Sequence, residues 1–144
     1  MSNIIKTIVV HMSYTRPSQD IGAKEIRDWH TSPDPNDPSK PWSDIGYHDV
    51  IRRDGTIEEG RPYNQQGAHV KGRNRNSLGV CLVGGRKENA DEPEFNFTRK
   101  QMWALESYIR DRKRRFNDPD IRGHNDYAPD RACPGFNVRE YFKR

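Results

Sequence analysis

Apolar residues recur along the chain at two spacings, one typical of strands and one typical of helices. Runs rich in isoleucine, valine and leucine predict strands over residues 4–11, 47–53, 56–61, 78–83 and 120–123. The run 78–83 is continuously apolar and closes on Gly84-Gly85, which favours a strand buried on both faces. Asp54-Gly55 separates two of the segments, and this dipeptide is typical of a hairpin turn.

Helical spacing follows possible capping residues at three places. Ser18 is a plausible N-cap for a helix that ends near His30. Thr98 and Gln101 have the spacing of a capping box, and the apolar residues after them share one face of a helix that runs to Phe116. A short closing helix is expected over residues 138–142.

The segments between these elements are polar and rich in proline, glycine or asparagine. Residues 31–41 hold four prolines, residues 62–76 are irregular, and residues 125–135 form a third loop. Strands alternating with helices predict one α/β (α+β) domain over residues 1–144, with a central, mostly mixed sheet flanked by helices. At 144 residues the chain has room for one core and too little for two ordinary domains.

Charge adds little to this prediction. The net charge is +4, from 25 basic and 21 acidic residues, which favours encounters with anionic partners but assigns no chemistry. The basic run 110–115 falls on the polar side of the helix predicted from Thr98, so a solvated face explains it better than a nucleic-acid site. The apolar run 4–10 is too short for a signal core or a membrane span. We therefore expect a protein made and kept in the cytoplasm, without membrane insertion, and a monomer by default.

Two histidines and one cysteine suggest a metal site. His11 and His124 each directly follow an apolar, strand-like run, and neighbouring strands that end at one edge of a sheet would bring both rings together. Cys133 lies in the next loop and could fold back to the same place. Two imidazoles and one thiolate suit a single Zn²⁺ and leave the fourth tetrahedral position open, as in catalytic sites. Without CxxC or HExxH spacing, this pattern is not specific by itself.

The other cysteine and two of the other histidines have structural interpretations. Cys81 lies inside an apolar strand and is expected to be a buried small hydrophobe. His48 is expected to be a hydrogen-bonded structural residue. His30 stands at a helix end, where the helix dipole favours a positive charge.

Seven motifs occur in an order that resembles a known family: Val9-Val10-His11, Asp44-Ile45-Gly46-Tyr47-His48, the segment from Ile51 to Glu58, Gly67-Ala68-His69, the segment from Asn76 to Gly85, Gly123-His124 and Ala132-Cys133-Pro134-Gly135-Phe136. In combination they resemble the type 2 N-acetylmuramoyl-L-alanine amidases, which include the peptidoglycan recognition proteins. The pattern is most similar to the small phage lysozymes (endolysins) of the T7 type. The resemblance covers about residues 4–142.

The resemblance implies roles for individual positions. His11, His124 and Cys133 fall on the zinc ligands, and Tyr47 falls on the catalytic tyrosine. Arg131 stands where many members carry a lysine that stabilises the oxyanion. This substitution keeps the positive charge, so activity should survive, with an altered pH dependence.

Two further positions have open interpretations. The resemblance suggests that His69 lines the substrate groove, but a histidine in a glycine-rich connection can equally be exposed. Asn76 either binds substrate or caps a turn. The loop at 31–41 is longer than in the compact phage enzymes, and it either edges the cleft or lies inert on the surface.

As a member of this family, the chain would cut the amide between the lactyl group of N-acetylmuramic acid and L-alanine in peptidoglycan. A small catalytic domain of this type implies a phage or prophage endolysin, held in the host cytoplasm until it is released to the periplasm and cell wall. Two alternatives are a peptidoglycan-binding module without catalysis, against which the intact Cys133 and Tyr47 argue, and a regulator that binds a polymerase.

Overall fold

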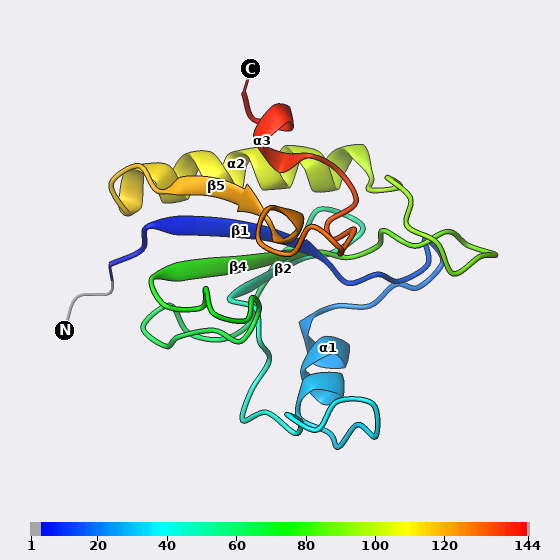
Figure 1. The fold of residues 1–144 in the computed structure, drawn as a ribbon. Helices are drawn as coiled ribbons and strands as arrows, with labels where there is room; N and C mark the ends of the chain where they lie inside the picture. The colour runs from blue at the N-terminus through cyan, green and yellow to red at the C-terminus, as the bar shows by residue number, and fades with distance from the viewer. Residues whose placement is uncertain (1–3, 144) are drawn as a thin grey trace.

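The computed structural model describes residues 4–143, and within them the centre is a five-stranded sheet with the order β3-β2-β4-β1-β5 (Figure 1). The strands are β1 (Thr7–Met12), β2 (Asp49–Ile51), β3 (Ile57–Glu59), β4 (Ser77–Leu82) and β5 (Asp120–Gly123). Only β3 is antiparallel to its neighbour, and the pairs β2–β4, β4–β1 and β1–β5 are parallel. All five predicted strands and the mixed sheet are therefore confirmed.

The first strand of the chain occupies a central place in the sheet. β1 lies between β4 and β5, with His11 opposite Cys81 and Val10 opposite Gly123. Because β1 and β5 are parallel, their carboxyl ends meet at one edge. His11 and the residue that follows β5, His124, are thus brought to the same edge.

Helices cover both faces of the sheet (Figure 1). The long helix α2 (Arg99–Arg115) and the short α3 (Val138–Tyr141) pack on one face, and α1 (Ala23–His30) packs on the other. Strand residues therefore alternate between two cores: Val10 and Leu82 face α2, and Val50 and Cys81 face α1. Both faces of β4 are covered, as its continuous apolar run predicts.

Most element boundaries lie within two residues of the sequence-based prediction, and the starts of the first helix and the first strand differ by more. The first helix begins at Ala23 rather than after Ser18, because the Ser18 hydroxyl donates to Glu88 in another loop (2.6 Å) instead of capping a helix. Gly22 occupies the N-cap position, and its N–H donates to Glu25 (2.7 Å). The first strand begins at Thr7 rather than at residue 4. A 3₁₀ turn, η1 (His124–Asp126), follows β5 where only a loop is predicted.

Within residues 4–143, no helix combines the length and the apolar character that a membrane span requires.

Candidate metal centre

His11, His124 and Cys133 lie together at the edge of the sheet. Each offers one ligand atom, and the three atoms lie within 4.8 Å of one another. The Cys133 Sγ and His11 Nδ1 atoms are 3.9 Å apart. In a tetrahedral zinc site, ligand atoms are separated by roughly 3.3–3.6 Å, given the usual zinc–nitrogen and zinc–sulfur bond lengths. The donor set and its spacing therefore fit one zinc ion after a small contraction.

The surroundings of the three side chains also suit a metal. His11 is buried, whereas His124 and Cys133 are partly exposed, so the group is open on one side. Burial lowers the pKa of both histidines, which keeps the imidazoles in the neutral form that binds metals. Burial raises the pKa of the Cys133 thiol to about 12 in the metal-free protein. Binding of zinc would have to displace this proton.

Local backbone hydrogen bonds place the second and third ligands. The η1 turn carries His124, and Gly123 N–H donates to the Asp126 carboxylate (2.8 Å) at its start. Asn125 N–H then donates to the Cys133 carbonyl (2.8 Å), which closes the loop. Met12 N–H donates to Cys133 Sγ (3.2 Å), so the sulfur is attached to the end of β1. The loop predicted over 125–135 therefore returns Cys133 to His11, as the sequence analysis expects.

Tyr47 and Arg131 lie beside this cluster. The Tyr47 ring centroid is 5.1 Å from that of His11. Burial raises the pKa of Tyr47 well above its usual value, so the phenol keeps its proton, and the positive charge of Arg131 opposes this effect. The Arg131 side chain is exposed, and its charge also lowers the pKa values of His124 and Cys133. The structure therefore brings a neutral hydrogen-bond donor and a cation to the candidate metal site.

The proline-rich loop supports Tyr47 from outside. Trp42 follows this loop, and its ring packs on His30 at 4.7 Å between centroids. His30 in turn packs on Tyr47 at 5.5 Å. The loop at 31–41 is thus connected to the site through a row of three rings.

His69 lies behind His11 rather than on the surface. It is 8% exposed, which excludes the interpretation as an exposed loop residue. Its Nδ1 atom lies 2.9 Å from His11 Nε2, and its Nε2 atom lies 3.1 Å from Ser77 Oγ. This contact of His69 and Ser77 with His11 was not predicted from the sequence. Gly67 and Gly79, which leave room for the ring, were the available signal.

Asn76 lies far from the metal ligands. It directly precedes β4, whose first residue Ser77 is opposite Thr7, and His11 is four positions further along β1. Four residues of strand correspond to roughly 13 Å. Asn76 has a positive φ of 60°, and its carbonyl accepts from Lys6 N–H (2.8 Å). This conformation is the one in which asparagine commonly forms turns.

Three residues interpreted as structural are buried or hydrogen-bonded. Cys81 is fully buried, as predicted. His48 accepts from Gly79 N–H (3.1 Å) and donates to the Gln65 carbonyl (2.9 Å), which confirms its structural role. His30 ends α1, but the reason given for it was wrong. Burial lowers its pKa to about 4, and its Nδ1 accepts from Gly46 N–H (2.9 Å), so the ring is neutral rather than a cation at the helix dipole.

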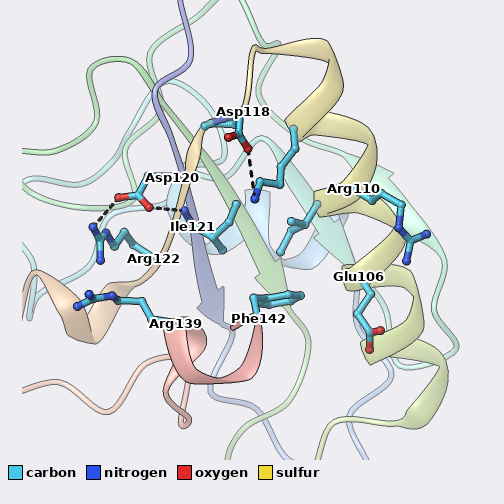
Figure 2. A pocket seen from close by; sticks show the side chains of 11 residues that line it. Glu106, Arg110, Asp118, Asp120, Ile121, Arg122, Arg139 and Phe142 are labelled. Carbon is cyan, nitrogen blue, oxygen red and sulfur yellow. Dashed lines mark hydrogen bonds and ion pairs between the residues drawn. The ribbon is translucent and has the colours of Figure 1, made fainter. Parts of the chain in front are cut away.

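A hollow in the surface lies away from the His–His–Cys cluster. It has a volume of about 610 Å³ and is bordered by α2, β5 and α3 (Figure 2). Side chains of both signs surround it, and Lys113–Asp118 (3.3 Å) and Arg122–Asp120 (2.5 Å) form ion pairs at its rim. Four basic and three acidic side chains line it in all, so the hollow does not strongly favour a ligand of one sign.

Proteins of known family are similar to this chain over nearly its whole length. The chain matches the family described as N-acetylmuramoyl-L-alanine amidase over residues 1–136. It is 43% identical to an endolysin of Klebsiella phage KP32 over 95% of this chain and 85% of the relative. An endolysin of Escherichia phage T7 is 41% identical over the same shares of the two chains.

A solved structure with the same fold is the N-acetylmuramoyl-L-alanine amidase LysC from Clostridium intestinale. It superimposes with a TM-score of 0.74 at 30% identity, over 96% of this chain and 83% of that chain. The family match over residues 1–136 spans both the sheet and the loop that carries Cys133. Together, the edge of the sheet with its His–His–Cys cluster and these matches show that the chain belongs to the N-acetylmuramoyl-L-alanine amidase family.

Proposed function

We propose that this chain is a zinc-dependent N-acetylmuramoyl-L-alanine amidase that cuts peptidoglycan between the lactyl group of N-acetylmuramic acid and L-alanine. The observation that supports it best is the convergence of His11, His124 and Cys133 within 4.8 Å, beside the protonated Tyr47. These three side chains would hold one zinc ion. A zinc ion in such a site supplies a Lewis acid and activates water near neutral pH.

The protein side chains then act on the charge that develops at the scissile carbonyl. In this proposal Tyr47, which keeps its hydroxyl proton, donates a hydrogen bond to the carbonyl oxygen as that oxygen becomes negative. Arg131 adds a positive charge at the open side of the site. An arginine side chain does not act as a proton donor, so the leaving amine of L-alanine takes its proton from water.

The biological role that fits these relatives is that of an endolysin. Endolysins of two phages align with nearly the whole chain. We propose that the protein acts in host lysis, as a monomer, after passing from the cytoplasm to the cell wall.

The test is zinc content and amide cleavage, measured on purified peptidoglycan for wild type, Cys133→Ala and Cys81→Ala. Wild type should bind about one zinc per chain and release stem peptides with a new L-alanine amino terminus. Cys133→Ala should lose both properties. Cys81→Ala removes the other cysteine and no ligand, so it should keep its zinc. Zinc-free wild type that binds sacculi without releasing peptides would replace the amidase proposal with a recognition role.

A further inference from the structure

A line of hydrogen bonds begins at His11 Nε2, the ring nitrogen that does not face Cys133. His11 Nε2 lies 2.9 Å from His69 Nδ1, and His69 Nε2 lies 3.1 Å from Ser77 Oγ. Ser77 Oγ in turn donates to the carbonyls of Arg73 (2.8 Å) and Asn74 (3.1 Å). His11, His69 and Ser77 are all less than a tenth exposed.

The carbonyls at the end of this line fix the direction of the bond between His69 and Ser77, and the neutral form of the buried rings fixes the direction of the bond between His11 and His69. A carbonyl only accepts, so the Ser77 hydroxyl gives its proton to Arg73 or Asn74 and accepts from His69 Nε2–H. Burial favours neutral imidazoles, so His69 Nδ1 carries no proton and accepts from His11 Nε2–H. His11 Nδ1 is left with a free lone pair, and this is the atom that faces Cys133 Sγ at 3.9 Å.

The fold makes a specific place for the His69 ring. A side chain at Gly79 would bring its Cβ within 2.6 Å of the His69 ring, and one at Gly67 would come within 2.8 Å. Asn74 Oδ1 accepts from the backbone N–H groups of His69 and Val70, both at 2.8 Å. The short segment from residue 67 to residue 79 therefore leaves the space for the His69 ring and fixes the His69 backbone.

We propose that His69 is a positioning residue, which together with Ser77 holds His11 in the tautomer that presents Nδ1 to the metal. This inference rests on the proposed role of His11 as a zinc ligand. His69 then acts through His11 and does not contact the substrate, which replaces the expectation that it lines the groove. Partners of this kind, placed behind a metal-binding histidine, fix ring orientation and tautomer.

The first experiment reads the tautomer directly in zinc-free protein. Nitrogen chemical shifts of labelled histidines should show His11 protonated at Nε2 in wild type. His69→Leu removes the acceptor, and His11 should then populate both tautomers. His69→Asn offers a side-chain oxygen close to the position of Nδ1 and should restore the Nε2–H form. If His69→Leu does not fold, the tautomer is measured in Ser77→Ala instead. This smaller change removes the hydroxyl that accepts from His69 Nε2–H.

The second experiment measures zinc affinity by competition with a chromophoric chelator. His69→Leu should bind zinc about 10–100-fold more weakly, and His69→Asn should recover most of the loss. Equal zinc affinity and an unchanged His11 tautomer in His69→Leu would overturn the proposal. Wild type without zinc affinity but with the Nε2–H tautomer of His11 would instead reject the metal role, while the hydrogen-bonded line would stand.

Discussion

Arg131 is the residue at which this site departs from the resemblance, since many family members carry a lysine there. The guanidinium is exposed, yet its charge influences the pKa values of Tyr47, His124 and Cys133. A cation that reaches the site from the solvent side can stabilise an oxyanion without being buried itself. Its contribution should therefore depend on charge more than on the shape of the side chain.

Replacing Arg131 tests this dependence on charge. Arg131→Ala should lower kcat on peptidoglycan by about 100-fold, the usual effect of losing one group that stabilises an oxyanion. Arg131→Lys should keep most of the activity. Arg114→Ala removes an exposed arginine from α2 and serves as the control for net charge. Similar rates for the alanine and lysine variants would contradict a role for the charge.

His30 makes stability sensitive to acid. Its pKa is about 4 in the folded protein, below the usual 6.5, because the ring is buried. A lowered pKa contributes stability above pH 6.5, and this contribution is lost as the pH falls towards 4. Asparagine can also accept from Gly46 N–H, so His30→Asn should keep the hydrogen bond without the titration.

Urea unfolding of chelator-treated protein at pH 7 and pH 4.5 measures this effect. Wild type should lose about 1 kcal/mol more than His30→Asn between the two pH values, a figure reduced from the full shift because the ring is partly exposed. An equal loss in both proteins would show that His30 does not contribute to acid sensitivity.

The clustering of His11, His124 and Cys133 could be predicted in part from the sequence, because two apolar runs end at His11 and His124 and neighbouring parallel strands share an edge. The buried position of His69 behind His11 could not be predicted from the sequence. Whether a histidine in a glycine-rich loop is exposed or buried depends on the space that Gly79 leaves on β4, and that space exists only once β4 and the loop pack together. Tyr47 and Arg131 were assigned by resemblance alone, since neither has a distinctive spacing.

At the scale of elements, the residues that cap the start of α2 also connect this helix to the sheet. Gln101 N–H donates to Thr98 Oγ1 (3.0 Å), and Thr98 N–H donates to Gln101 Oε1 (2.9 Å), as the capping box predicts. The buried Gln101 amide also donates to the carbonyls of Ile51 (3.1 Å) and Val83 (2.8 Å). One side chain therefore joins the helix start to the ends of β2 and β4.

Substitutions at the two capping residues separate these roles. Thr98→Ala should lower the free energy of unfolding by about 1 kcal/mol, the usual cost of a lost N-cap. Gln101→Leu should cost more, about 2–3 kcal/mol, because it removes both amide N–H donors to the carbonyls of Ile51 and Val83 and also the oxygen that accepts from Thr98 N–H. Chemical denaturation of the zinc-free variants measures both values. A smaller loss in Gln101→Leu than in Thr98→Ala would reject the bridging role.

Elements with a clear apolar period were predicted well, and those defined by tertiary contacts were not. α2 and β4 have nearly the predicted bounds because their apolar residues repeat along the whole element. α1 starts four residues later than expected, since Ser18 bonds with Glu88, a partner 70 positions away that no local pattern indicates. The one-turn η1 is too short to carry a period.

Across the whole molecule, a buried carboxylate connects the sheet with α2. Asp49 on β2 is 1% exposed, and its Oδ2 accepts from Tyr63 and Tyr108 (both 2.7 Å). The Arg112 guanidinium lies 3.9 Å from the same oxygen, stacks over Tyr108 at 4.0 Å and donates to Tyr63. Burial raises the pKa of Asp49, so the carboxylate depends on these partners.

Removing the arginine should leave an uncompensated buried group. Arg112→Met should lower the free energy of unfolding by about 3 kcal/mol, the order found when one partner of a buried pair is removed. Arg114→Met, on the exposed face of the same helix, is the matched control and should change stability by less than about 0.5 kcal/mol. Equal effects of the two substitutions in thermal or urea unfolding would contradict this account.

The separation of the ligands along the chain has a consequence for the timing of activity during synthesis. His11 lies on the first strand of the sheet, whereas β5, which pairs with it, and Cys133 come 109 or more positions later. A ribosome therefore makes His11 long before Cys133, and domains generally fold as units. A nascent chain that has not yet released the segment after β5 cannot complete the centre. Hydrolytic activity would thus begin only when translation of this segment is finished, which protects the translating cell from partly made enzyme.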